Sequence, residues 1–192
     1  VNKYIYNQGT ITRIGGGCAV IDMAIWNAGG NLNISSELVV NGNMGTPLDP
    51  PSILSTGNIR LDDDSLLVVN DGLSQATGTL SLQPGADASI VGNVFAYNKA
   101  TIDMGGGIAV SRLYVDGSLT MIDTTLIAKV SLGSPDLILA TDDVLIADKG
   151  SSCTLRIFLT SPLVVANIST IIHSDTKLTG QFTNRYWGKT GT

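Results

Sequence analysis

Three consecutive carboxylates, Asp62, Asp63 and Asp64, form the densest group of candidate metal ligands in the chain. Carboxylate oxygens are the ligands that hard cations such as Ca²⁺ prefer. The run follows an alternating apolar segment and precedes Ser65, which places it in a turn after a strand. The repeated calcium-binding nonapeptide of glycine-rich β-rolls does not occur in the chain. We therefore expect one calcium site at most, at Asp62, Asp63 and Asp64, and no other cofactor.

Catalytic arrangements have fewer candidates. Glycoside hydrolysis needs two carboxyl groups roughly 5 to 10 Å apart, and the acidic residues form no stripe along the chain. His173 is the only histidine, so a Ser-His-Asp triad or a zinc-bound imidazole would have to use it. No nucleophile elbow accompanies it, and we interpret it as a surface residue. The sequence favours a protein that is not an enzyme, with a carbohydrate-active protein as the alternative.

Four residues are candidates for assembly: Cys18, Cys153, Tyr186 and Trp187. The segment Gly15–Val20 is echoed by Gly105–Val110, with Cys18 in the slot of an isoleucine, which predicts a buried, unreactive thiol. Cys153 lies about seven repeats later, roughly 30 Å away at a strand spacing of about 4.8 Å, too far for an intramolecular disulfide. A disulfide between two molecules stays open. The aromatic pair would cap the apolar end of the fold or form an interface.

A repeated four-residue pattern, called the phrase below, predicts the strands that position these residues. In each copy a small polar, an apolar, a polar and another apolar residue follow one another. Its starts are 17 to 27 residues apart. Such a loose period with strand-like alternation is typical of a solenoid. The eight copies are Thr10–Arg13, Asn31–Ile34, Asn58–Leu61, Thr79–Leu82, Thr101–Met104, Ser118–Met121, Asp136–Leu139 and Thr154–Ile157.

Alternation within the phrase predicts which side chains face inward, because successive side chains of a strand point to opposite sides. We expect the two apolar positions of each phrase to form inward columns, from Leu32 and Ile34 through Leu137 and Leu139 to Leu155 and Ile157. The outward column shows neither paired acids nor aromatic platforms for sugars. Its members are Asn33, Arg60, Ser81, Asp103, Thr120, Ile138 and Arg156.

The phrase predicts an all-β chain that forms a single parallel β-helix of about eight coils. The solenoid would span residues 1–160, and residues 161–192 would form a C-terminal cap or assembly segment of the same domain. Arg13 falls in an inward slot of the first copy, which indicates an end rung. The segment Met44–Gly57 contains Pro47, Pro50 and Pro51 and predicts a loop that leaves the stack.

Charge and hydropathy limit the partners. The net charge of -5 and the pI near 4.6 argue against nucleic acid or an anionic membrane surface as a partner, because both reward basic patches. No apolar stretch is long enough to span a membrane as a helix, so we expect no direct membrane insertion. The two ends of a β-helix expose unpaired strand edges, which can pair with another copy of the chain. We therefore expect the chain itself as a partner, in a homo-oligomer or filament.

The stretch Trp26–Ile34, with its Asn27-Ala28-Gly29-Gly30 turn, followed by Leu38–Val40, resembles the β-helices of filamentous haemagglutinins and autotransporter passengers of bacterial surfaces. The segment Lys177–Phe182 is similar to the C-terminal region of autotransporter passengers. The resemblance implies an extracellular or cell-surface structural or adhesive protein, with a host surface or a polysaccharide as a further partner. It brings no catalytic residues. The alternative is a carbohydrate-binding or polysaccharide-cleaving β-helix of the pectate-lyase or tailspike type.

Overall fold

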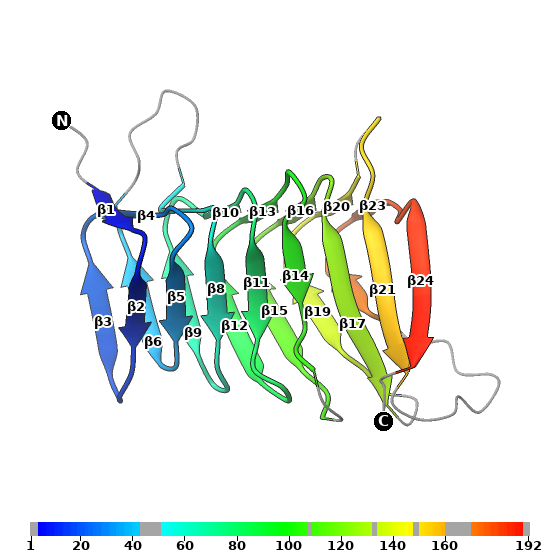
Figure 1. Cartoon of the computed structure of the whole chain (residues 1–192), viewed down its shortest axis with the longest axis horizontal. Coiled ribbons are helices and arrows are strands. Elements are labelled where there is room, and N and C mark those ends of the chain that lie inside the picture. The colour runs from blue at the N-terminus through cyan, green and yellow to red at the C-terminus, as the bar shows by residue number, and fades with distance from the viewer. Residues whose placement is uncertain are drawn as a thin grey trace.

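The computed structural model describes residues 4–42, 51–106, 109–131, 134–147, 150–159 and 170–189. In these residues every regular element is a β-strand, and no helix is present that could cross a membrane. The strands stack along one axis in three parallel sheets, named A, B and C below (Figure 1). The predicted all-β parallel β-solenoid is confirmed.

Sheet A is built from the shortest strands, and all of its pairs are parallel. Its order follows the chain: β1 (Tyr4–Asn7), β4 (Ala24–Asn27), β7 (Ile53–Ser55), β10 (Leu73–Gln75), β13 (Val94–Ala96), β16 (Leu119–Met121), β20 (Val144–Ile146) and β23 (Leu178–Gly180).

Sheet B contains the longest strands, and one short strand, β18 (Ser134–Pro135), pairs antiparallel with it. The other members are β2 (Thr10–Arg13), β5 (Asn31–Ile34), β8 (Asn58–Leu61), β11 (Thr79–Leu82), β14 (Thr101–Asp103), β17 (Thr125–Ser131), β21 (Thr154–Leu159) and β24 (Asn184–Lys189).

Sheet C closes the coil behind sheet B in the view of Figure 1. It consists of β3 (Cys18–Ile21), β6 (Glu37–Val40), β9 (Leu66–Val69), β12 (Asp87–Val91), β15 (Arg112–Asp116), β19 (Leu137–Ala140) and β22 (Ile172–Ser174). One strand from each sheet makes a coil, and we number the coils from the N-terminus. Within the described residues seven coils have three sides, and β23 with β24 adds an incomplete eighth.

The eight repeated phrases do not all lie in one sheet, so they do not mark one coil each. The predicted count of about eight coils becomes seven complete coils and an incomplete eighth, and the coils are longer than the spacing of the phrases indicated. The first five phrases and the last lie along sheet B, but Ser118–Met121 contains β16 of sheet A and Asp136–Leu139 lies along β19 of sheet C. Both belong to coil 6. In sheet B the stacked strands start 21 residues apart at the first pair and 30 at the last. Strands of every sheet alternate in the same way, so alternation alone cannot tell the sheets apart.

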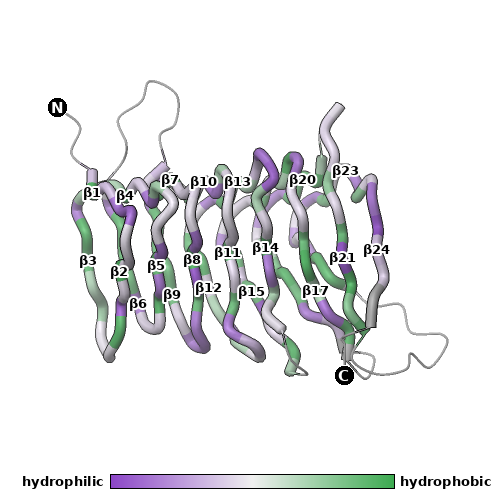
Figure 2. The backbone as a smooth tube through the Cα atoms, in the orientation of Figure 1, coloured by the Kyte–Doolittle hydropathy of each residue, from purple (hydrophilic) through white to green (hydrophobic). Residues whose placement is uncertain are grey.

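The core is a continuous inner stack of apolar side chains, and most predicted inward positions are buried. Figure 2 colours the backbone by hydropathy and shows apolar residues recurring along the strands of successive coils. Leu137 and Leu139 are an exception, because Ile138 and Ala140 of β19 are buried instead. The reason is Asp136, which occupies an inward slot and sets the parity of the strand. Ile138, predicted to face outward, therefore belongs to the core.

Stacked glycines form the corner between sheets A and B in the first coils. A Cβ atom on Gly57 would lie 2.1 Å from the carbonyl oxygen of Gly30, and one on Gly78 would lie 2.1 Å from that of Gly57. Gly78 also has a φ of +71°. The turns approach one another so closely that only glycine fits, which explains the Gly-Gly turn in the sequence.

Two segment predictions need revision. Ile53–Ser55, placed in a loop by the sequence, is strand β7 of sheet A, whereas residues 43–50 of that segment lie outside the described residues. The segment predicted as a differing cap continues the solenoid over residues 170–189, where β22, β23 and β24 extend all three sheets. Its strands are weakly apolar, so the phrase fades although the coil does not.

Candidate functional site

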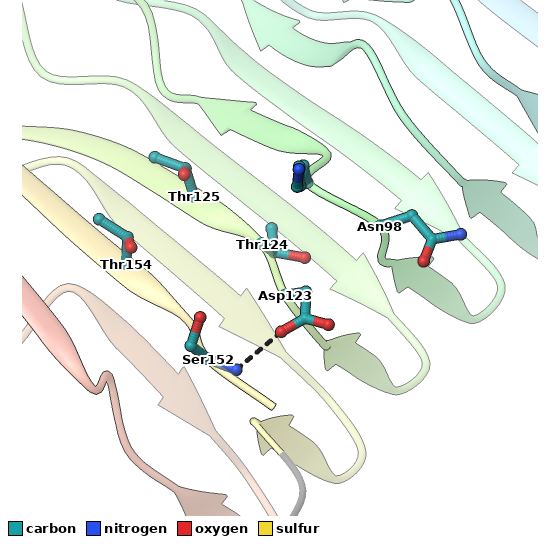
Figure 3. A pocket seen from close by; sticks show the side chains of 7 residues that line it. Asn98, Asp123, Thr124, Thr125, Ser152 and Thr154 are labelled. Atoms are coloured by element: carbon teal, nitrogen blue, oxygen red, sulfur yellow. Dashed lines mark hydrogen bonds between the residues drawn. The ribbon is translucent and has the colours of Figure 1, made fainter. Parts of the chain in front are cut away.

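A polar hollow of about 590 Å³ lies at the corner between sheets A and B, in coils 5 to 7 (Figure 3). Asn98, Lys99 and Asp123 line it with left-handed backbone angles, at φ values of 52°, 69° and 50°. Such angles are uncommon for residues other than glycine and make tight corners. The complete lining is Asn98, Lys99, Asp123, Thr124, Thr125, Ser152 and Thr154.

Hydrogen bonds between coils hold this hollow open. The Lys99 backbone N–H donates to the Asp123 carbonyl at 2.7 Å, and the Ser152 N–H donates to Asp123 Oδ1 at 2.7 Å. The buried Thr124 hydroxyl donates to the Ala96 carbonyl at 2.9 Å. The lining offers hydroxyls, an amide, one cation and one carboxylate, which suits hydrogen bonding to a polar ligand. It lacks the second carboxyl group that glycoside hydrolysis uses.

The aspartate run predicted as a calcium site lies at the corner between sheets B and C. Asp62 accepts hydrogen bonds from Arg60 Nε at 2.8 Å and from the Ser35 hydroxyl, and Asp63 Oδ1 accepts the Asp87 N–H at 2.9 Å. These contacts use the carboxylates to tie neighbouring coils together. Among the described residues no group of three His, Cys, Asp or Glu side chains is arranged to hold a metal ion. The calcium site stays a prediction.

Asp63 and Asp64 nevertheless share a hollow of about 520 Å³ with the half-buried Glu37. The triple-glycine turn forms its opposite side, and Gly15 and Gly17 have φ values of 89° and 83°, as a tight corner requires. The complete lining is Gly15, Gly16, Gly17, Ser35, Ser36, Glu37, Asp63, Asp64 and Leu66.

The two cysteines have opposite surroundings. Cys18, predicted to be buried, is exposed on the outer side of the edge strand β3, in register with Glu37. Partial desolvation, and then the Glu37 carboxylate, raise the pKa of its thiol above the usual value. Cys153 is 0% exposed, and its thiol donates to the Met121 carbonyl at 3.2 Å. Cys153 therefore cannot form a disulfide with a second molecule in this conformation.

The aromatic pair lies on β24, the last strand of sheet B. Tyr186 faces outward with the Arg156 guanidinium 5.9 Å from its ring centre. Trp187 is in register with the buried Ile157, yet 64% of its surface is exposed. Phe158 joins these four residues around a hollow of about 210 Å³. The pair therefore lies at the C-terminal end of sheet B, and its role as a cap or an interface stays a prediction.

His173 lies on β22 at the end of sheet C, and its Nε2 is 3.2 Å from Asp175 Oδ1. Both side chains are more than half exposed. This agrees with the prediction of a surface histidine.

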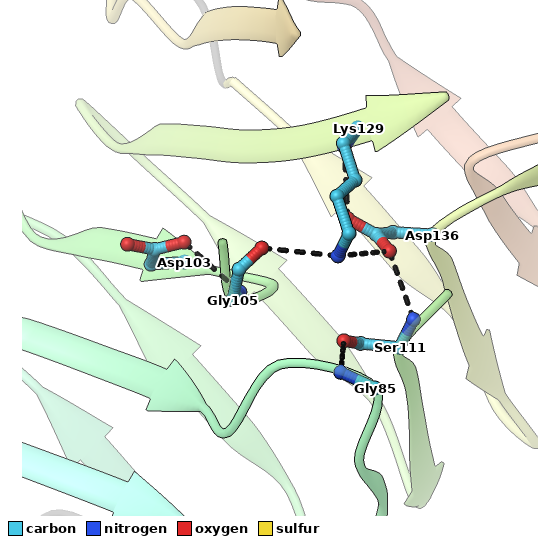
Figure 4. Close-up of polar contacts among 6 residues, drawn as sticks. All are labelled: Gly85, Asp103, Gly105, Ser111, Lys129 and Asp136. Carbon is cyan, nitrogen blue, oxygen red and sulfur yellow. Dashed lines mark hydrogen bonds and ion pairs between the residues drawn. The ribbon is translucent and has the colours of Figure 1, made fainter. Parts of the chain in front are cut away.

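The sequence reasoning missed a buried ion pair between Lys129 and Asp136 (Figure 4). Lys129 Nζ is 2.8 Å from Asp136 Oδ1 and also donates to the Gly105 carbonyl at 3.0 Å. The carboxylate accepts the Ser111 N–H at 2.9 Å and the Lys129 N–H at 2.8 Å. Burial raises the pKa of Asp136, although these hydrogen bonds oppose the shift. A lysine inside the apolar run Ala128–Val130 was the available signal.

The outer face of sheet A was also missed. Tyr6, Trp26 and Phe95 occupy one outward column there, which corrects the prediction that no aromatic platform exists. The repeated phrase lies mainly in sheet B, so its period does not report the outward residues of sheet A. The alternation Tyr4-Ile5-Tyr6 and Val94-Phe95-Ala96 would have revealed them.

Comparison with known proteins gives no relative to guide the interpretation of these sites. No family model, no curated protein and no solved structure matches the chain.

Proposed function

We propose that this chain is a non-catalytic structural and adhesive β-solenoid of a bacterial surface or the extracellular space, of the filamentous-haemagglutinin or autotransporter-passenger type. The three-sided solenoid and the turn that contains Asn27, Gly29 and Gly30 support this assignment. Asn27 is fully buried, and a Cβ atom on Gly30 would lie 2.7 Å from the Gly9 carbonyl oxygen. The turn is thus a structural part of the coil rather than a chance motif.

The open C-terminal rung carries the proposal that the molecule assembles end to end. Ile157 is 4% exposed because β24 covers it, whereas Trp187, in the next slot of the same column, is 64% exposed. Leu178 of β23 is likewise exposed at the end of sheet A. Both side chains stand where a further coil would bury them, next to strand edges that no described strand pairs with.

A second copy of the chain is the proposed partner of this rung. Its edge strand would supply backbone hydrogen bonds, and burial of Trp187 and Leu178 would supply the hydrophobic gain. Arg185 occupies the other inward slot of β24 and keeps a charge on this end, so we expect association of moderate strength. A C-terminal rung on an N-terminal rung gives a filament, and two C-terminal rungs give a closed pair.

Sedimentation equilibrium of Trp187→Ala tests this proposal. We expect the variant to associate at least about thirtyfold more weakly than the unchanged protein, as for a buried interface tryptophan. Tyr114→Ala is the control, because Tyr114 is an exposed aromatic residue of sheet C far from the ends. Equal association of all three proteins, or a monomer in every case, would overturn the proposal.

A second candidate function, polysaccharide cleavage, is favoured by one observation. Glu37, Asp63 and Asp64 line the same hollow at the corner between sheets B and C, and two carboxyl groups are the usual catalysts of glycoside hydrolysis. Reducing-end assays with neutral and acidic polysaccharides, using the unchanged protein and Glu37→Gln, test it. Release of sugar ends that the variant abolishes would support cleavage. If no substrate releases sugar ends, polysaccharide cleavage is ruled out for these substrates and the structural role remains the proposed function.

A further inference from the structure

The outer face of sheet A differs from the rest of the surface in its chemistry. The pairing register aligns one outward residue of each strand in a single column along the axis. Its members are Tyr6, Trp26, Leu54, Ser74, Phe95, Thr120, Leu145 and Thr179. None of them is charged. The equivalent column of sheet B contains Arg60, Asp103 and Arg156, so the outward column of sheet A carries fewer charges than that of sheet B.

Aromatic rings form two platforms in this column. In the first, Tyr6 packs edge-on against Trp26 with ring centres 5.1 Å apart, and Tyr4 contacts the same indole at 5.7 Å. In the second, Phe95 and Tyr97 lie 4.8 Å apart with their planes inclined by 35°. Ring contacts of this kind hold the side chains in place, so each platform is organised before any ligand binds.

The two platforms remain accessible. Tyr6 is 52% exposed and Phe95 is 37% exposed. They lie in coils 1 and 5, four strand steps apart, which corresponds to about 19 Å along the axis. Between them the column carries Leu54 and the small hydroxyl residue Ser74. No charged side chain of the column separates the platforms.

The shape of this face is a narrow strip. The sheet A strands from β4 to β20 are only three or four residues long, which makes the face about 10 to 13 Å wide. It is longer along the axis than across it. A compact protein partner needs a broad patch of 20 to 30 residues, whereas an extended polymer one residue wide fits a strip.

We propose that the outer face of sheet A binds a neutral linear polysaccharide whose chain runs along the solenoid axis. Sugar rings would stack on the Tyr6 platform and on Phe95, and the Ser74 and Thr120 hydroxyls would hydrogen-bond to sugar hydroxyls. An anionic polysaccharide would be repelled by the net charge of -5 and would find no cation in the column. This inference rests on the adhesive role proposed above and names its ligand class, but it does not depend on end-to-end association.

Affinity electrophoresis and pull-down with defined polysaccharides test this inference. The probes are cellulose, chitin and xyloglucan as neutral chains, and polygalacturonate as an anionic chain. We expect retention by at least one neutral chain, and a loss of about fivefold to thirtyfold in affinity for Phe95→Ala and for Tyr6→Ala. Tyr114→Ala is a closely matched control, because Tyr114 is 39% exposed on sheet C and Phe95 is 37% exposed.

Three results would overturn the inference: no retention by any probe, retention by polygalacturonate alone, or an equal loss in Tyr114→Ala. Sedimentation of Phe95→Ala tests a fourth result. If the unchanged protein forms a dimer that this variant does not form, the outer face of sheet A binds a second copy of the chain and not a polysaccharide. The end rung is tested separately. Trp187→Ala should lose association and keep polysaccharide retention, and Phe95→Ala should do the reverse, so failure of either proposal can be recognised without the other.

Discussion

The N-terminal and C-terminal halves of the solenoid fill the same inner column of sheet A with opposite chemistry. In coils 1 to 4 the column is polar and buried, and in coils 5 to 7 it is apolar. The polar members are Asn7, Asn27, Ser55 and Gln75, and the apolar ones are Ala96, Met121 and Ile146. The parallel pairing of sheet A continues through both halves. A solenoid coil therefore does not dictate its core chemistry, provided that the turn carbonyls find donors.

The polar column supplies those donors. Asn27 Nδ2 donates to the Ser55 hydroxyl and to the Asn58 carbonyl, both at 3.1 Å. Asn27 Oδ1 in turn accepts a hydrogen bond from the Asn7 amide at 2.8 Å. Gln75 donates to the Gly57 carbonyl at 2.8 Å. Asn7, Asn27 and Ser55 are linked directly, so a neutral ladder of this kind can pass from coil to coil. Gln75 bonds to turn carbonyls instead, and among the described residues its Oε1 has no hydrogen-bond partner.

The C-terminal half contains a buried charged contact, between Lys129 and Asp136. This pair links β17 to the Gly105 and Ser111 backbones of the preceding coil. Two buried charges need each other and cannot be spread over several coils.

The halves also differ at their ends. The Arg13 guanidinium covers the first rung by donating to the carbonyls of Gly17 at 2.6 Å and Glu37 at 3.1 Å, whereas Trp187 leaves the last rung open.

The largest expected difference between the halves is in thiol reactivity. The exposed Cys18 of coil 1 should react with a disulfide reagent at once, and the buried Cys153 of coil 7 at least about a thousandfold more slowly, because it must wait for unfolding. Because the pKa of Cys18 is raised, its reaction rate should keep increasing with pH beyond the pH at which an ordinary thiol is fully ionised. Cys18→Ser is the control. Rapid reaction of Cys153 in that variant would contradict its placement in the core.

Removal of one buried charge should cause the largest loss of stability in the C-terminal half. We expect Lys129→Met to lower the free energy of unfolding by about 3 to 5 kcal/mol, since Asp136 would remain buried without its cation. The double variant Lys129→Met with Asp136→Asn should recover most of this loss. Denaturant titration measures both. A single variant as stable as the unchanged protein would show that the pair is not buried.

Interruption of the neutral ladder should lower the free energy of unfolding by less than Lys129→Met does. Asn27→Ala removes the acceptor of one Asn7 amide N–H and a donor to the Asn58 carbonyl, while the Asn7 amide keeps the Asn31 carbonyl as a partner. We expect a loss of about 1 to 3 kcal/mol in the free energy of unfolding in the same titration. Met121→Leu, in the same column of the C-terminal half, is the control and should cost less than about 1.5 kcal/mol. A smaller loss for Asn27→Ala than for Met121→Leu would remove the distinction between the halves.

The smallest effect is expected at the first rung. Inward-pointing charges on edge strands oppose strand addition, so Arg13→Leu should open this end and strengthen end-to-end association by about fivefold, roughly 1 kcal/mol. Arg60→Leu is the control, because Arg60 faces outward from β8. Unchanged or weaker association of Arg13→Leu would mean that the first rung takes no part in assembly.

The sequence predicted most of the architecture because alternation reports burial directly. The first five phrases lie in sheet B as expected, and Arg13 lies in the end rung. Prediction failed where the alternation alone does not set parity or sheet identity. In β19 Ile138 and Ala140 face inward in step with the buried Asp136, which pairs with Lys129 seven residues earlier. The aromatic column of sheet A was overlooked because its residues are about twenty or more positions apart and align only after the coils close.

Negative-stain electron microscopy of the unchanged protein over a range of concentrations tests the proposal of end-to-end association most directly. We predict rods joined at their ends, as pairs or as filaments one coil wide, with a share that grows with concentration and falls in Trp187→Ala. Single rods of one length at every concentration would contradict the proposal.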